Sequence, residues 1–386
     1  MAYPLENLRV LDLSRVLAGP FAGRMFADLG ADVVKLEPPD GDTTRLWGAD
    51  IGGNPGYYHQ QNVGKRNVCI DLGKPRAAEL VKALAAACDV VIENFRPGVA
   101  NRLGVGYAAL SEANPRLVML SISGFGQEGP EAQRAAFAPV IHAEAGLIDR
   151  QARNTKSGQL VDIAFSASDT QAALHGMVAV LSALWMRERT GRGQHIDMAM
   201  FDATLATDDF LHYALEDSWE TRVLASEVWE APGGPILISA DFRHIWQQFS
   251  RAFAITDPSP AGAGVAEKSD FRHQAIQRHI LSLPDRAAVT AQLDLLNLAW
   301  GDVRRSEDTR DQPTARHRGA IGEVDGRAGG TRPVVQSPYR FSAAESGLRR
   351  PAPWKGEHND EVLAEWLGFD TAARASWAPV LVSGRV

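Results

Sequence analysis

The sequence predicts an α/β fold built on a mainly parallel β-sheet with helices on its faces. Over roughly the first 200 residues, short apolar runs alternate with longer runs of helical spacing, which is typical of βαβ units. The short runs are almost continuously apolar, as in "DVVI" at residues 89–92, which indicates strands buried on both faces. At 386 residues the chain is also too long for one ordinary domain, so more than one is expected.

The elements of this sheet are expected in a regular order along the chain. Each strand is a short apolar or β-branched run, and each helix is a longer run with apolar residues three or four apart. The expected strands lie at residues 8–14, 32–39, 66–72, 90–95, 115–126 and 194–200, and the expected helices at 20–31, 74–89, 168–189 and 201–216.

The longest helical pattern runs from Ser168 to Arg189, and Gly191 follows it as a natural C-terminal stop. Asp169 lies in its first turn, where Ser166 or Ser168 can supply the capping oxygen. A carboxylate there gains about 0.3–1 kcal/mol from the helix dipole, so a structural role is sufficient. The same field favours the ionised form that a nucleophilic aspartate needs. From the residues alone, both roles stay open.

The pattern changes after about residue 220, where short helices and loops mix. A polar, glycine-bearing stretch then lacks any apolar period and indicates a linker or a crossing segment. Strand and helix signals return near the C-terminus. We therefore expect a large α/β domain at 1–220, a small domain at 221–303, a polar linker at 304–332 and a C-terminal segment at 333–386 that returns to the large domain.

Composition excludes several classes of protein. The formal net charge of −7 argues against a nucleic-acid partner. The N-terminus lacks a secretory pattern, and no apolar stretch approaches the length of a membrane span, so no membrane partner and a cytoplasmic location are expected. The two cysteines, Cys69 and Cys88, lie outside any metal-ligand spacing and are interpreted as buried thiols.

Two places near expected strand ends are candidates for ligand binding. The first strand–loop–helix lacks the G-x-G-x-x-G fingerprint, so Glu37 is poorly supported as a ribose-binding acid, although an anion site at the helix N-terminus stays open. In "ENFRPG", Asn94 and Phe95 follow an expected strand and emerge where α/β sheets bind ligands. An ordinary turn made by Pro97 and Gly98 is the alternative.

The histidines and serines give no independent catalytic signal. The histidines at 142, 175, 195 and 212 form no metal constellation, so we expect structural roles and no metal. No serine lies in a G-x-S-x-G motif, so a hydrolase triad has no support.

Six segments together resemble the class III CoA-transferases, the CaiB/BaiF family that includes formyl-CoA transferase and the carnitine and bile-acid CoA-transferases. They extend through most of residues 5–220 and again over about 333–368. The segments are "LRVLDLSRVLAGPFAGRMFADLGADVVKLEPPDGDTTR", "GKRNVCIDL", "DVVIENFRPGVANRLGVGY", "SISGFGQEGP", "RERTGRGQHIDMAMFDATL" and "LRRPAPWKGEHNDEVLAEWLG".

The resemblance implies a role for Asp169. In the family an aspartate stands 21 residues before a T-G-[RK]-G-Q segment, and here that segment begins at Thr190. Asp169 is therefore implied to be the nucleophile that attacks the acyl-CoA donor. The implied reaction passes through a mixed anhydride and an aspartyl-CoA thioester, and a small carboxylic acid accepts the CoA. Coenzyme A enters as substrate, and no metal or tightly bound cofactor is implied.

The resemblance also implies the CoA contacts and the form of the protein. The residues that match the family's CoA channel are Arg15, Lys74, Asn94, Phe95 and Arg102. Leu17 replaces the glutamine of formyl-CoA transferase, and only Gly233 and Gly234 could substitute for its glycine-rich flap, so formate and oxalate are not the first choice of substrate. The implied form is a Rossmann-like large domain with a smaller α+β domain, in ring-like protomers that interlock as a homodimer.

Two alternatives to a transferase stay open. In the related α-methylacyl-CoA racemases, a histidine lies 11 residues after the first glycine of "GQxGP", where this chain has Phe137. His142 lies five residues farther on, and phenylalanine cannot transfer protons. The second alternative is a catalytically silent CoA-binding protein, which the altered region after residue 300 leaves open.

Overall fold

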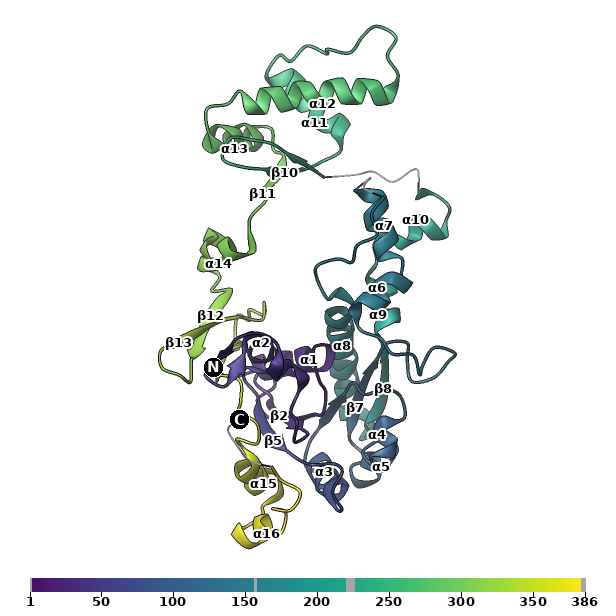
Figure 1. Cartoon of the computed structure of the whole chain (residues 1–386), viewed down its shortest axis with the longest axis vertical. Helices are drawn as coiled ribbons and strands as arrows, with labels where there is room; N and C mark the ends of the chain where they lie inside the picture. Colours follow the sequence, from purple (N-terminus) through teal and green to yellow (C-terminus); the bar gives the residue numbers. More distant parts are fainter. Residues whose placement is uncertain (1, 156–157, 220–225, 383–386) are drawn as a thin grey trace. The chain divides into compact units, whose positions relative to one another are not determined.

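The computed structural model describes residues 2–155, 158–219 and 226–382 and divides into two compact units (Figure 1). One unit joins Met1–Asp208 with Arg316–Val386, and the other is Asp209–Ala315. The expected boundary at residues 220 and 221 lies outside the described residues. The four-segment division made from the sequence therefore stays a prediction.

The larger unit contains a six-stranded sheet in which every neighbouring pair is parallel, as predicted. Its order is β5-β2-β1-β6-β7-β8. Valine, isoleucine and leucine fill its central strands because these strands are buried on both faces. The strands are β1 (Arg9–Asp12), β2 (Asp32–Glu37), β5 (Arg66–Cys69), β6 (Val90–Glu93), β7 (Val118–Ser123) and β8 (Gln194–Ala199).

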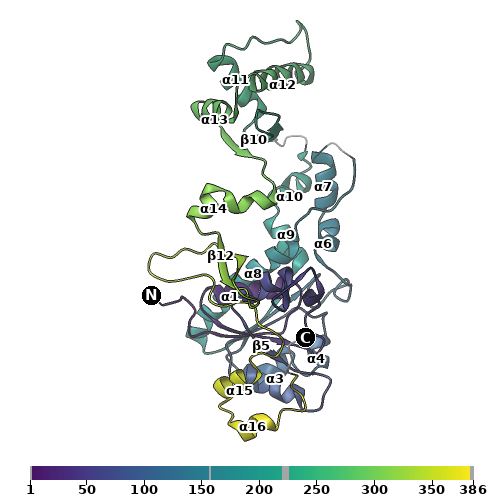
Figure 2. The ribbon, with the colours of Figure 1, turned by 60° about the vertical axis from the view of Figure 1, so that its left-hand side comes forward.

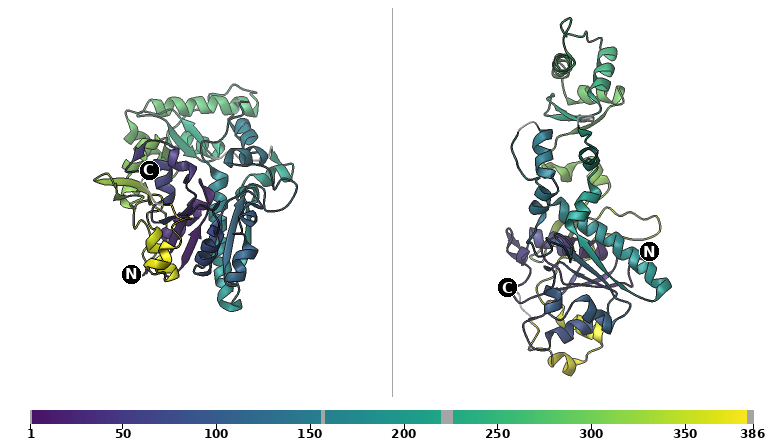
Figure 3. Two further views of the ribbon diagram at one scale, coloured as in Figure 1. Left: turned by 60° about the horizontal axis from the view of Figure 1, so that its bottom comes forward. Right: turned by 90° about the vertical axis from the view of Figure 1, so that its right-hand side faces the viewer.

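Helices cover both faces of this sheet, as Figures 2 and 3 show. One face packs its apolar side chains against α1 (Ala18–Asp28), α8 (Ala167–Thr190) and α9 (Met200–Thr207). The other face packs against α3 (Ala77–Ala86), α5 (Tyr107–Ala113) and α15 (Asn359–Leu367). The carboxyl ends of the strands are thereby left as the accessible edge, where ligands bind in sheets of this type.

Shorter elements complete the larger unit. A hairpin of β12 and β13 lies partly within residues 304–332, where the sequence indicated a polar linker. The alternation of apolar and polar residues in these two strands is short and interrupted by glycine, so the sequence pattern did not reveal them. These elements are η1 (Thr43–Leu46), β3 (Asp50–Ile51), β4 (Asn54–Pro55), α2 (Gly56–Asn62), α4 (Val99–Arg102), α6 (Ala138–Glu144), α7 (Leu147–Asn154), α14 (Pro313–His317), β12 (Ile321–Asp325), β13 (Thr331–Val335) and α16 (Thr371–Ala375), with α14 spanning the boundary between the units.

The expected helix at residues 201–216 is wrong as a single element. The structure ends α9 at Thr207 and begins α10 (Leu211–Leu215) after a break. Asp208 leaves the helical conformation, and its carboxylate pairs with Arg150 of α7. A charged contact with another helix thus ends a run that periodicity alone would continue.

The smaller unit has its own core around Trp229, Ile236 and Phe249. Three antiparallel strands, β9 (Glu227–Trp229), β10 (Ile236–Ser239) and β11 (Ala299–Asp302), pack with α11 (Phe242–Ala252), α12 (Val265–Leu281) and α13 (Arg286–Leu295). The short helix η3 (Ser306–Asp311) follows. Among the described residues of both units, no helix combines the length and the apolar character that a membrane span requires.

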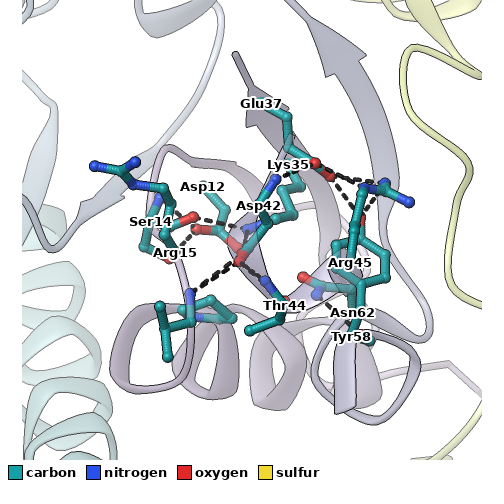
Figure 4. A network of polar contacts seen from close by, with 12 residues as sticks. Asp12, Ser14, Arg15, Lys35, Glu37, Asp42, Thr44, Arg45, Tyr58 and Asn62 are labelled. Atoms are coloured by element: carbon teal, nitrogen blue, oxygen red, sulfur yellow. Dashed lines mark hydrogen bonds and ion pairs between the residues drawn. The ribbon is translucent and has the colours of Figure 1, made fainter. Parts of the chain in front are cut away.

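A buried network of charges lies at the carboxyl ends of β1 and β2 (Figure 4). Asp12 and Lys35 are register partners in the two strands, and both are fully buried. Lys35 Nζ lies 3.2 Å from Asp42 Oδ2 and donates to the carbonyl of Ser14 at 2.7 Å. Lys65 Nζ donates to Asp12 Oδ2 at 2.8 Å and to the carbonyl of Pro20 at 2.8 Å. Opposite charges therefore compensate one another inside the core.

We predict that Lys65→Met destabilises the protein by about 3–5 kcal/mol, because Asp12 then remains buried next to fewer positive charges. Urea unfolding at neutral pH measures the change. Lys74→Met is the control, because Lys74 is exposed, and it should change the free energy of unfolding little. Equal effects of the two substitutions would contradict the prediction.

Candidate active site

A cavity of about 340 Å³ opens at the carboxyl ends of the central strands. Its lining includes Arg15 and Val16 after β1, Asn94 and Phe95 after β6, and Asp169 at the start of α8. All of these residues belong to the larger unit. The topology thus brings four of the residues selected from the sequence, Arg15, Asn94, Phe95 and Asp169, to one concave site.

Three helix N-termini meet at the carboxylate of Asp169. Backbone N–H groups of Ala18, Ala138 and Asp169 itself act on it and lower its pKa, and these residues lie at the starts of α1, α6 and α8. The positive ends of the helix dipoles and the free N–H groups favour an anion at this point. The site therefore favours a carboxylate and negative charge that develops next to it.

Burial nevertheless dominates the titration of Asp169. The side chain is only 9% exposed, and this burial raises its pKa to about 6, although the three N–H groups act in the opposite direction. The helix N-termini favour the ionised form, as expected, but the loss of hydration has the larger effect on the pKa. Above about pH 7 the group is still mostly ionised, and it is more basic than an ordinary aspartate.

The expected cap of α8 is also wrong. Ser166 makes no capping hydrogen bond, and the hydroxyl of Ser168 accepts from Thr204 of α9 at 2.8 Å. The N–H of Ser168 donates instead to Nε2 of His142 at 3.3 Å, while Nδ1 of this fully buried histidine lies 2.8 Å from Asp162. We assign the neutral ring with its proton on Nδ1, donated to Asp162. A histidine on α6 thus holds the turn that carries Asp169.

The turn at Arg15 and Val16 is held in an unusual conformation. Val16 has a φ of 68°, a left-handed conformation that a β-branched residue rarely adopts. Its N–H lies 3.2 and 3.3 Å from the two oxygens of Asp42, so the buried charge network fixes the turn. Asn94 exchanges two 2.8 Å hydrogen bonds with the backbone of Arg15, and the Arg15 guanidinium lies 5.8 Å from the centre of the Phe95 ring.

The remaining residues implied as CoA contacts lie apart from this cavity. Lys74, in the turn before α3, and Arg102, at the end of α4, are exposed and are not part of its lining. Arg96 and Arg134 do line it and were not selected from the sequence. Arg96 follows Asn94 and Phe95 directly in "ENFRPG", so the strand-end argument already contained the signal for it.

Glu37 is not available as a ligand-binding acid. Arg45 and the hydroxyl of Tyr58 bind its carboxylate at 2.8 and 2.6 Å (Figure 4). Burial acts to raise its pKa, but the hydrogen bond and charge of Arg45 outweigh it and lower the pKa to about 2. Glu37 therefore serves the core. Among the described residues, no group of three or more histidine, cysteine or acidic side chains could hold a metal ion.

The positions at which the chain differs from formyl-CoA transferase lie in both units. Leu17, at the position of the glutamine, is buried as the residue before α1. Gly233 and Gly234 have φ values of 84° and 114° and form the turn between β9 and β10 in the smaller unit. Positive φ at both positions explains why glycine occurs there.

The chain is similar to known proteins over nearly its whole length. The model of CoA-transferase family III matches residues 5–359. The chain is 33% identical to the succinate–glutarate CoA-transferase of Agrobacterium fabrum over 94% of this chain and 95% of that protein. It is 29% identical to human succinyl-CoA:glutarate CoA-transferase over 96% and 87%. The crystal structure of a CaiB/BaiF family protein from Brucella suis matches with a TM-score of 0.80 and 30% identity, over 95% of this chain and all of that one.

We predict that Asp169→Asn stabilises the fold more at pH 8 than at pH 5, by about 1–2 kcal/mol. The raised pKa of Asp169 means that the folded protein binds this proton more tightly than the unfolded chain does. Wild type therefore loses stability as the pH rises from about 4 to about 6, and the asparagine variant does not. Urea unfolding at the two pH values measures the difference, with exposed Asp40→Asn as the control. A gain that is independent of pH would contradict the prediction.

Proposed function

The chain belongs to CoA-transferase family III, as its sequence resemblance predicted, and on this premise we propose that it transfers CoA from an acyl-CoA thioester to a free carboxylic acid, with Asp169 as the nucleophile. The observation that carries the proposal is the placement of Asp169. It is a buried carboxylate at three helix N-termini, and it lines a cavity whose other side chains include three arginines.

The reaction proceeds by four nucleophilic substitutions at carbonyl carbons. A carboxylate oxygen of Asp169 attacks the donor carbonyl, the carbon–sulfur bond breaks, and CoA leaves as a thiolate from a mixed anhydride. The thiolate then attacks the Asp169 carbonyl carbon, which releases the donor acid and leaves an aspartyl-CoA thioester. The acceptor carboxylate attacks this thioester and again displaces the thiolate. The thiolate finally attacks the acceptor carbonyl, which releases acyl-CoA and the Asp169 carboxylate.

The raised pKa of Asp169 suits this nucleophile. A carboxylate with a pKa of about 6 is a stronger nucleophile than an ordinary aspartate, and it is still mostly ionised near neutral pH. The N–H groups of Ala18 and Ala138 point at the carboxylate, so they can also stabilise the oxyanion that forms at its carbon. Burial excludes water, which would otherwise hydrolyse the anhydride and the thioester.

The arginines indicate the class of substrate. Arg15 and Arg96 line the cavity, and neither has a carboxylate partner in the part of the chain that the structure describes. A free guanidinium binds a carboxylate or a phosphate with two hydrogen bonds. We propose CoA phosphates and the distal carboxylate of a dicarboxylic acid as their partners. The names of the Agrobacterium and human relatives, which combine succinate or succinyl-CoA with glutarate, support succinyl-CoA as donor and a dicarboxylate as acceptor.

The site supports neither the α-methylacyl-CoA racemase nor the catalytically silent CoA-binding protein. The position of the racemase histidine is Phe137, whose ring is exposed and lines the cavity. His142 is fully buried, and its two nitrogens are engaged by Asp162 and Ser168. A second proton-transferring group is therefore missing from the two positions considered. A silent CoA-binding protein would not need a nucleophile with a raised pKa.

We further propose that the protein acts in the cytoplasm as an interlocked homodimer of ring-like protomers. Leu174, Val178, Leu181 and Trp185 form an apolar row along the exposed side of α8, where residues three or four apart lie on one face. A second copy of the chain that covers this row would remove it from water, which supports the dimer.

We predict that incubation with succinyl-CoA labels the wild-type peptide that contains Asp169 with CoA, with loss of one water. Intact-protein and peptide mass spectrometry detect the thioester, and Asp169→Ala should abolish it. A full panel of acyl-CoAs that gives no adduct, together with deuterium exchange at the acyl α-carbon, would favour the racemase. Saturable CoA binding without turnover would favour the silent binding protein.

We predict that His142→Leu lowers kcat by about 10- to 100-fold with little change in KM, because the turn that carries Asp169 loses its hydrogen bond. His142→Gln should recover most of the activity, since its amide can accept from Ser168 and donate to Asp162. Steady-state kinetics with succinyl-CoA and glutarate measure both parameters, and melting temperatures exclude a general loss of structure. Equal losses in the two variants would contradict the positioning role.

A further inference from the structure

A second group of polar side chains lies on the face of the sheet opposite to α8. Glu93, Ser121 and His195 come from the neighbouring strands β6, β7 and β8 and share this face with Val91 and Met119 of the core. They line a separate cavity of about 240 Å³. The reaction proposed above uses none of the three.

The three side chains lie in a row. Oγ of Ser121 lies 2.8 Å from Nε2 of His195, and Ser121 also acts on the Glu93 carboxylate as a hydrogen-bond donor that lowers the pKa of this group. Glu93 and Ser121 are only 3% and 1% exposed, whereas His195 is exposed and stacks on Tyr107 at 5.2 Å. A proton can therefore pass between solvent and the buried carboxyl through the imidazole and the hydroxyl.

The same carboxylate holds the segment that lines the candidate active site. Oε2 of Glu93 accepts the N–H of Phe95 at 2.7 Å. Asn94 lies between Glu93 and Phe95 in the sequence, and its side chain hydrogen-bonds to the backbone of Arg15. Glu93 thus lies under the segment Asn94–Arg96, which faces the Asp169 cavity, and the Arg96 side chain lines both cavities.

We propose that Glu93 is a positioning residue that couples the uptake of one proton, passed through His195 and Ser121, to the conformation of Asn94–Arg96 and so to acyl-CoA binding. This inference rests on the proposed function. When Glu93 is ionised, Ser121 donates to it, and the carboxylate binds the N–H of Phe95 strongly. When Glu93 is protonated, its O–H donates to Ser121, Ser121 donates to Nε2 of His195, and the bond to Phe95 weakens.

The groups around Glu93 place its change of protonation near physiological pH. Burial raises the pKa of Glu93 to about 7, in spite of the bonds from Ser121 and Phe95, and the charge of Asp197 on β8 acts in the same direction as burial. Partial desolvation of the ring also lowers the pKa of His195, against the effect of Asp197. Arg96 and Tyr107 are the other charged or titratable groups that line this cavity. The shift of Glu93 favours a protonated carboxyl below about pH 7 and an ionised one above it, and the shift of His195 favours a neutral ring.

Calorimetric titration of the full-length protein with CoA, between about pH 5.5 and about pH 8.5, tests the proposal. Glu93→Gln copies the protonated form, since its amide can accept from Phe95 and donate to Ser121. The ratio of its Kd to that of wild type should rise from near 1 at the lowest pH to about fivefold at the highest, as the charge-assisted bond of wild type forms. The midpoint should lie at about pH 7. Taking the ratio cancels the titration of CoA and of Asp169.

Two further variants complete the test. Exposed Glu112→Gln, on α5, is the matched control, and its ratio should stay near 1 at every pH. His195→Phe keeps a ring on Tyr107 but removes Nε2, so Ser121 donates to Glu93 alone and the midpoint should move to lower pH. A Glu93→Gln ratio that is constant with pH, or an unchanged midpoint in His195→Phe, would overturn the inference while CoA binding leaves the proposed function intact. Absence of CoA binding by wild type at any pH would overturn both.

Discussion

Buried opposite charges at the ends of β1 and β2 are the constraint on which the site depends. Asp12, Lys35, Asp42 and Lys65 are almost completely excluded from water, so each must have a partner close by. The pairing that satisfies them also holds the carbonyl of Ser14 and the N–H of Val16. The turn before α1 therefore has one conformation, although Val16 is strained in it. The N-terminus of α1 is then directed at Asp169 by the core itself.

Asp169 shows how two opposing effects produce a useful carboxylate. Three helix N-termini stabilise its charge, and burial removes the hydration that would stabilise it further. The result is a group that is anionic near neutral pH but carries excess basicity, at a cost to the stability of the fold. Glu37, at the end of β2, has the opposite outcome, because a guanidinium binds it directly. A carboxylate therefore stays reactive when no guanidinium binds it directly, and this matters more than how deeply the carboxylate is buried.

The sequence predicted the parallel sheet and the long helix because their signals are local and periodic. The residues Asn94 and Phe95 could be selected because the end of a parallel strand is a recognisable place. Asp169 could be selected as a candidate, but its role came from resemblance. His142 as the cap of α8, the conformation of Val16 and the row from Glu93 to His195 could not be predicted. Each depends on contacts between side chains of different elements, and the spacing of residues along the sequence does not reveal such contacts.

The link between the sheet and the end of the chain has a consequence for synthesis. Arg66 on the outermost strand β5 binds Glu361 and Glu365 of α15, at 2.9 and 2.7 Å, and Ile70 pairs with Leu381. Glu361 and Glu365 leave the ribosome almost 300 residues after Arg66 does, and Leu381 follows later still. During that interval the nascent sheet has an open edge that can pair with other chains. Translation speed and chaperone binding thus become determinants of the yield of native protein.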